Sequence, residues 1–230
     1  SSGSIERPIV FGNNDTPGVM LSSAAKEYLK VYGVLVGKKP LVFTNNDSGY
    51  ETAIEFKKNG IDPIILDTRK EPQSEIVDEA KNLGINIKFS HVVVAAQGYK
   101  KVKSADIAKI SDDKEQLGKV ENIKCDCICV SGFWTPTIHL ASQSGNKTKF
   151  NEDIDAFVPG ISKQNETTLG AANGSYVLDE TLKSSFKAGL DLSKKITKND
   201  NEISFPNVVE KKSTTHDKFW CVPLPEGKNY

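Results

Sequence analysis

The sequence has no long hydrophobic run, no net charge and few cysteines. No apolar stretch approaches the ~20 residues needed to cross a bilayer, and the N-terminus lacks the layout of a secretory signal peptide. The 30 basic and 30 acidic residues cancel, which gives no support for nucleic acid or a membrane surface as a partner. An ordinary globular protein of the cytoplasm is therefore expected.

Four cysteines among 230 residues are too few for a disulfide scaffold. Cys125, Cys127 and Cys129 alternate with other residues, so on a strand they would share one face. Metal-binding cysteines are usually separated by two to four intervening residues on a turn, whereas a single residue separates each neighbouring pair here. We predict buried, unpaired thiols on a core strand and no metal site.

The three histidines, His91, His139 and His216, lie in different predicted elements. No serine or cysteine nucleophile pattern accompanies them, so a catalytic triad is not predicted. The sequence therefore offers no catalytic residue.

The hydrophobic pattern alternates between strands and helices in the first half of the chain. Strands are predicted at 40–44, 63–67 and 86–89, with helices at 48–58 and 74–83 between them. An earlier helix, capped by Ser22 or Ser23, should end at Gly33. This order predicts an α/β fold, a Rossmann-like three-layer domain with a parallel sheet and right-handed crossovers.

The pattern changes after residue 90. Runs at 91–96, 99–110 and 117–124 predict an antiparallel β-meander, followed by a returning buried strand at 127–130. The last third is more broken, with one helix whose apolar face runs from Leu178 to Leu190 and a charged linker at 194–202.

The turn after the first strand of this unit resembles a degraded dinucleotide fingerprint. In G-x-G-x-x-G the glycines allow the turn, the approach of the pyrophosphate and the packing of helix on strand. Those positions fall on Thr44, Asn46 and Gly49, with Asn45 and Asp47 between them. Only the packing glycine is present, and Asp47 adds a negative charge where a pyrophosphate would approach.

Asp67 ends the next strand, where an acid would bond a ribose hydroxyl and favour NAD over NADP. An acid at a strand end is also common in a solvated turn. Two hypotheses therefore stay open, a dinucleotide site at residues 44–49 and a fold kept without its ligand.

Several segments together resemble the pyridine nucleotide-disulfide oxidoreductase superfamily and, within it, the alpha-subunit family of heterotetrameric sarcosine oxidases. The resemblance runs from about residue 2 to about residue 190 and is carried by G-S-I-E-R-P-I-V-F at 3–11, N-D-T-P-G-V-M at 14–20, V-F-T-N-N-D-S-G at 42–49, C-D-C at 125–127 with V-S-G-F-W-T-P at 130–136, and G-A-A-N-G at 170–174.

The resemblance implies one Rossmann domain interrupted by another. Residues 1–35 and 144–192 would be pieces of the outer domain, 36–143 the inserted domain, and 193–230 a linker and tail. The outer domain's own glycine-rich turn would precede residue 1, so the chain would be the interior of a longer one.

The resemblance also implies outer cofactor contacts at Gly3, Gly132, Gly170, Ala171 and Asn173. Flavin-binding members carry aspartate where this chain has Ala171, so the outer site would suit NAD rather than FAD. FAD and FMN would be held elsewhere in the complex. The helix that follows would point its positive end at a pyrophosphate.

Three hypotheses on function follow. The chain would be part of an amine oxidoreductase subunit that demethylates sarcosine or a similar amine, supplying dinucleotide-binding scaffold and showing no turnover alone. It would otherwise be a relic Rossmann module with a structural or subunit-interaction role, or a stand-alone NAD-binding protein. Expected partners are the other subunits, the rest of its own subunit, and a second copy pairing through exposed strand edges.

Overall fold

The structure is a computed structural model that describes residues 3–197, 204–205 and 216–224. The chain forms two compact units. Unit 1 consists of residues 1–5 and 134–214, and unit 2 of residues 6–133 and 215–230. The predicted boundaries at 35/36 and 143/144 fall inside units 2 and 1, because residues 19–32 pack against the predicted inserted domain. The assignment of an outer and an inserted domain stays a prediction.

Unit 2 is built on a five-stranded parallel sheet in the order β2-β9-β3-β4-β5. Its strands are β2 (Val19–Leu21), β3 (Pro40–Thr44), β4 (Ile64–Asp67), β5 (Asn86–Phe89) and β9 (Cys127–Ser131). An antiparallel meander follows β5, made of β6 (His91–Gln97), β7 (Ser104–Ile110) and β8 (Leu117–Lys124). The predicted α/β class, with a parallel sheet and a meander, is confirmed.

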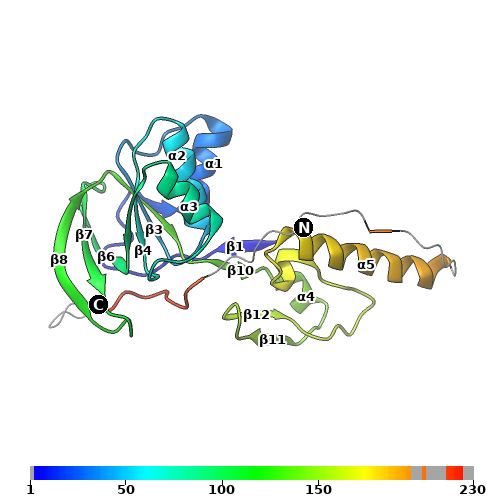
Figure 1. Ribbon diagram of the computed structural model, residues 1–230. Helices are drawn as coiled ribbons and strands as arrows, with labels where there is room; N and C mark the ends of the chain where they lie inside the picture. Colours follow the sequence, from blue (N-terminus) through cyan, green and yellow to red (C-terminus); the bar gives the residue numbers. More distant parts are fainter. Residues whose placement is uncertain (1–2, 198–203, 206–215, 225–230) are drawn as a thin grey trace. The chain divides into compact units, whose positions relative to one another are not determined.

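Three helices cover one face of the parallel sheet and the meander covers the other (Figure 1). The helices are α1 (Ser22–Tyr32), α2 (Ser48–Lys58) and α3 (Glu75–Asn82). Two apolar cores separate these three layers, one against the helices and one against the meander. Buried on both faces, β3 and β9 are apolar without alternation, as expected for central parallel strands.

Helix α1 begins differently from the prediction. Its N-cap is Leu21, and no cap side chain bonds the first turn. The Glu6 carboxylate, from far along the chain, accepts hydrogen bonds from Ser23 N at 2.8 Å and Ser23 Oγ at 2.6 Å. Burial raises the pKa of Glu6, although the bonds from Ser23 oppose the rise. Gly33 ends the helix in a left-handed conformation, as predicted.

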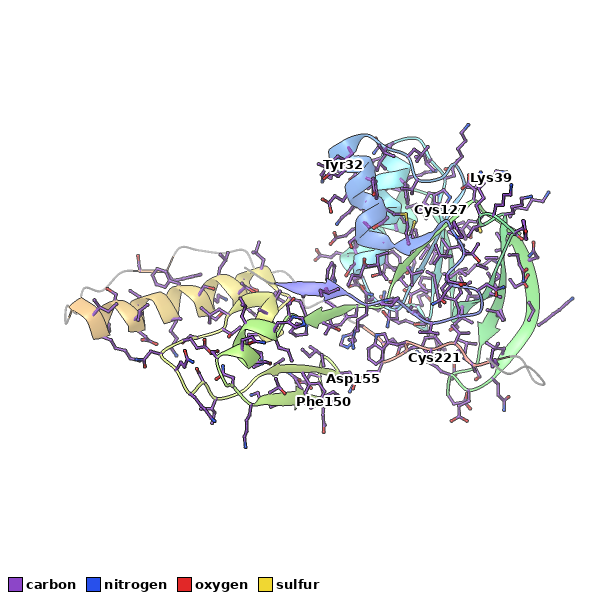
Figure 2. All side chains as sticks on the ribbon, turned by 180° about the vertical axis from the view of Figure 1, so that it is seen from behind. Tyr32, Lys39, Cys127, Phe150, Asp155 and Cys221 are labelled. Carbon is purple, nitrogen blue, oxygen red and sulfur yellow. The ribbon has the colours of Figure 1, made fainter. Side chains whose placement is uncertain are left out.

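The three clustered cysteines do not all share one face. Cys127 and Cys129 lie on β9 in the core beneath the helices, with their sulfurs 3.7 Å apart (Figure 2). Cys125 precedes the strand and lies in the opposite core, so the prediction was wrong for this thiol. Burial raises the pKa of Cys125 to about 12. In the described parts of the chain, no cluster of three or more metal-ligating side chains occurs.

Unit 1 is made of short elements and one long helix. They are β1 (Ser4–Glu6) paired with β10 (Trp134–Pro136), α4 (His139–Gln143), β11 (Thr148–Asn151) antiparallel to β12 (Ala156–Pro159), the 3₁₀ helix η1 (Gly170–Asn173), and α5 (Leu178–Thr197). Of β1, Ser4 and Ile5 belong to unit 1. Helix α5 continues into the predicted linker at 194–202, and residues 198–202 lie outside the described ones. Among the described helices, none has the length and apolarity of a membrane span.

Candidate functional site

The carboxyl edge of the parallel sheet holds most of the predicted cofactor contacts. From β3 the chain moves outward through β4 to β5 on one side, while β9 lies on the other side. The direction of winding therefore reverses between β3 and β9, which is where doubly wound sheets bind ligands. Thr44 and Ser131 are register partners there, and Asn45 N donates to Ser131 O at 3.2 Å.

The polar groups of the turn at residues 44–49 form hydrogen bonds within the turn and to Ser131 on β9. Asn46 N donates to Thr44 Oγ1 at 3.1 Å, and Ser48 N donates to Asn46 Oδ1 at 2.8 Å. The Asn46 amide also donates to the backbone and side-chain oxygens of Ser131, at 3.0 and 3.1 Å. A Cβ on Gly49 would lie 2.6 Å from the side chain of Thr44, so this glycine permits the close approach of helix and strand.

Asp67 belongs to a buried ionic network. Arg69 Nη2 donates to Asp67 Oδ2 and Arg69 Nη1 to Asp47 Oδ1, each at 2.8 Å. Arg69 Nε and N donate to Asp67 Oδ1 at 3.0 and 2.9 Å, and Tyr50 OH donates to Asp67 Oδ2 at 2.7 Å. The carboxylate of Asp67 is fully buried. A ribose hydroxyl would have to displace one of these donors, so the residues do not fit a dinucleotide here.

The electrostatics of the network favour its charged form. Burial alone lowers the pKa of Arg69, but the hydrogen bonds and charges of Asp67 and Asp47 outweigh it and raise that pKa. Burial, with the charge of Asp67, raises the pKa of Tyr50 far above its ordinary value. Sequence reasoning missed Arg69. The sequence did offer one sign of it: Arg7 and Arg69 are the only arginines in the chain. Both make contacts at this edge of the sheet.

Residues 216–222, here called the C-terminal strap, cross the same edge (red in Figure 1). Asp217 N donates to Asn45 O at 2.9 Å. The Asn45 amide donates to Asp217 O at 2.8 Å and Phe219 O at 2.9 Å. Val10 N donates to Trp220 O at 2.7 Å, and Val222 N donates back to Val10 O at 2.9 Å. The strap therefore adds to unit 2 through its backbone, and its broken apolar pattern gave no sign of this.

Side chains complete the attachment of the strap. The indole of Trp220 donates to Gly132 O at 2.5 Å, and the Arg7 guanidinium lies 4.1 Å from the indole centre. Phe219 and Val222 are buried in the core that faces the meander. The carbonyl oxygen of Gly132 is therefore occupied by its hydrogen bond from the strap. A Cβ at this position would lie 2.8 Å from Arg7 O, so a larger side chain does not fit.

Unit 1 carries the remaining predicted contacts. Gly3 has a left-handed φ of 60°, and no atom lies within 4 Å of a Cβ built on it, so its backbone is open to approach. Gly170, Ala171 and Asn173 form η1, and Gly170 O accepts from Ser175 N at 3.1 Å.

Helix α5 begins two residues after Tyr176, the predicted start. Asp179 and Glu180 occupy its first turn, and Asp179 Oδ1 accepts from Glu180 N at 2.7 Å. Its own acids therefore neutralise part of the positive helix end.

The chain is similar in sequence to the alpha subunits of sarcosine oxidases. It is 34% identical to the sarcosine oxidase alpha subunit of Corynebacterium sp. strain P-1 over 178 residues, 76% of this chain and 18% of that subunit. The same subunit of Rhizobium meliloti strain 1021 is 34% identical over 174 residues, 75% of this chain and 16% of that subunit. The chain is a relative of sarcosine oxidase alpha subunits. It spans less than a fifth of their length, and no family model matches it.

Solved structures agree on the fold. Thioredoxin reductase from Lactococcus lactis in its FR conformation matches with a TM-score of 0.63 at 14% identity, over 86% of this chain and 65% of that one. L-proline dehydrogenase from P. horikoshii matches with a TM-score of 0.55 at 20% identity, over 85% of this chain and 34% of that one. At these identities the two matches support the fold of the chain and nothing beyond it.

Proposed function

We propose that the chain is the scaffold part of an amine oxidoreductase subunit that demethylates sarcosine or a similar secondary amine. The observation that carries the proposal is the 34% identity to sarcosine oxidase alpha subunits over 178 residues. In the buried ion network at the sheet edge, the carboxylates of Asp47 and Asp67 are both paired with Arg69. The chain would bind and orient a cofactor and a neighbouring subunit, and alone it would show no turnover.

We assign the dinucleotide to unit 1, with Gly3, Gly170, Ala171 and Asn173 as its contacts. The open left-handed backbone at Gly3 supports this, because a phosphate can approach a glycine closely. Alanine at 171 cannot bond a flavin ribityl chain as aspartate would, which favours NAD. Bound NAD would supply hydride chemistry, and the chain would supply position.

Calorimetry on the whole chain tests this assignment. NAD should bind and FAD should not, and Ala171→Asp should raise FAD affinity while Ala172→Asp, its neighbour, should not. Absence of NAD binding would contradict the assignment.

The alternative role, a structural module without nucleotide, is favoured by one observation, the internal saturation of Asp67. Asp67→Asn should leave NAD affinity unchanged, as should Asp62→Asn at an exposed ion pair. Micromolar NAD affinity that Asp67→Asn abolishes would place the dinucleotide at the parallel sheet, and would overturn both the structural reading and the assignment to unit 1.

A further inference from the structure

The first two residues of the C-terminal strap combine a flat heterocycle with an anion. The imidazole of His216 stacks on the ring of Phe133, with centroids 3.9 Å apart and planes at 5°. Aromatic side chains hold nucleobases by this face-to-face contact. Phe133 is itself buried and holds a left-handed φ of 75°, so the stacking surface is fixed by the fold.

The neighbouring Asp217 carboxylate occupies an anion-binding position. It accepts from Thr68 Oγ1 at 3.2 Å and pairs with the ammonium of Lys114. A hydroxyl and a lysine are also phosphate ligands in proteins. Thr68 follows β4, whereas Lys114 comes from the turn between β7 and β8, so two layers of unit 2 converge on this carboxylate.

The position in the fold is the one that binds nucleotides in other doubly wound sheets. The backbone of Asp217 bonds to Asn45, which directly follows β3 at the point where the winding reverses. The negative charge of Asp47, which would repel a phosphate, is compensated by Arg69. Asp67 is also paired to Arg69, and Lys114 is a cation that meets the anion of the strap.

We propose that His216 and Asp217 act as a built-in mimic of a nucleotide. The imidazole takes the place of a base on Phe133, and the carboxylate takes the place of a phosphate between Thr68 and Lys114. A nucleoside monophosphate would bind the same edge only when His216 and Asp217 are displaced. This goes beyond the proposed function, which places the cofactor in unit 1.

The test uses the whole chain and a variant in which both mimicking side chains are removed, His216→Ala with Asp217→Ala. Phe219 and Val222 stay in place, so the apolar anchors of the strap are kept. AMP is titrated by calorimetry, with adenosine and inorganic phosphate as separate probes. We expect the double variant to bind AMP at least ten-fold more tightly than the wild type does. We also expect it to bind adenosine and inorganic phosphate each more weakly than AMP.

Two further variants decide the interpretation. Adding Lys114→Ala to the double variant should abolish the gain, whereas adding Asp62→Ala, at an exposed ion pair outside the edge, should preserve it. Hydrogen exchange of the β3 amides verifies that each variant is folded. A single Asp217→Asn variant, which keeps the shape of the side chain, should show part of the gain.

Hydrogen exchange at the strap amides completes the test. Loss of protection at residue 217 in the double variant, with no gain in AMP affinity, would overturn the proposal. Retained protection with no gain in AMP affinity would overturn it as well, because removal of the two side chains would then have opened no site for a nucleotide. Neither result depends on NAD binding by unit 1, so the two proposals fail separately.

Discussion

Replacing Arg69 with methionine removes the counter-ion of two buried carboxylates. The side chains of Arg69, Asp47 and Asp67 are exposed by 8%, 9% and 0%. Both ion pairs have N–O distances of 2.8 Å, and charge-assisted bonds of this kind contribute about 1.5–3 kcal/mol each. Breaking a buried pair costs about 3–5 kcal/mol, because the remaining charge is left in a poor solvent. We expect Arg69→Met to lower the free energy of unfolding by that amount at pH 7.

The loss should depend on pH in a defined direction. Without Arg69, the folded variant buries two carboxylate charges that lack their counter-ion, and the uptake of protons at lower pH removes this uncompensated charge. Its stability should then rise as the pH falls from 7 to 5, and the deficit against the wild type should shrink. Urea unfolding followed by circular dichroism measures this at both pH values.

Asp47→Asn is the matched comparison, because it removes one pair and leaves Asp67 with Arg69. Its cost should be smaller, about 1–3 kcal/mol. A loss below about 1 kcal/mol for Arg69→Met at pH 7, or a deficit that does not change with pH, would refute the reasoning.

Three further results are expected. Gly49→Ala should lower the free energy of unfolding by about 1–3 kcal/mol through overpacking, because the new methyl group would lie 2.6 Å from the side chain of Thr44. Gly189→Ala is the control: it has open space around it and should stabilise α5 by up to about 1 kcal/mol. Equal effects of the two changes in urea titrations would contradict this. Burial raises the folded-state pKa of Glu6 above its ordinary value, so the wild type loses stability as the pH rises through that pKa. The stability of Glu6→Gln relative to the wild type should therefore increase between pH 4 and pH 7, and a constant difference in unfolding free energy would argue against it. A thiol reagent at pH 8 should modify one exposed cysteine, Cys221, and reach the three buried ones only after unfolding; Cys221→Ser should remove the rapid phase, and a rapid phase that survives would disprove the assignment.

Four of the five strands in the parallel sheet of unit 2 were predicted from local sequence patterns. Residues 40–89 alternate between apolar runs and helical periods, and such patterns are local, so β3, α2, β4, α3 and β5 all occur where they are predicted. Gly49 was also predicted correctly as the packing glycine, because the turn that needs it lies within the same short segment. Strands of three residues, such as β1, β2 and β10, are too short to show a period and were missed.

The groups that occupy the carboxyl edge are brought there by contacts between residues distant in the sequence. The bond between Asn45 and Asp217 joins residues 172 positions apart, and the pair between Arg69 and Asp47 spans 22. Neither contact can be predicted from the local hydrophobic pattern. Polar residues that bond to each other in the core have the same polar character in the sequence as residues on the surface. The degraded fingerprint at residues 44–49 stays a prediction as a nucleotide site, and in this structure the strap bonds to Asn45 within that turn.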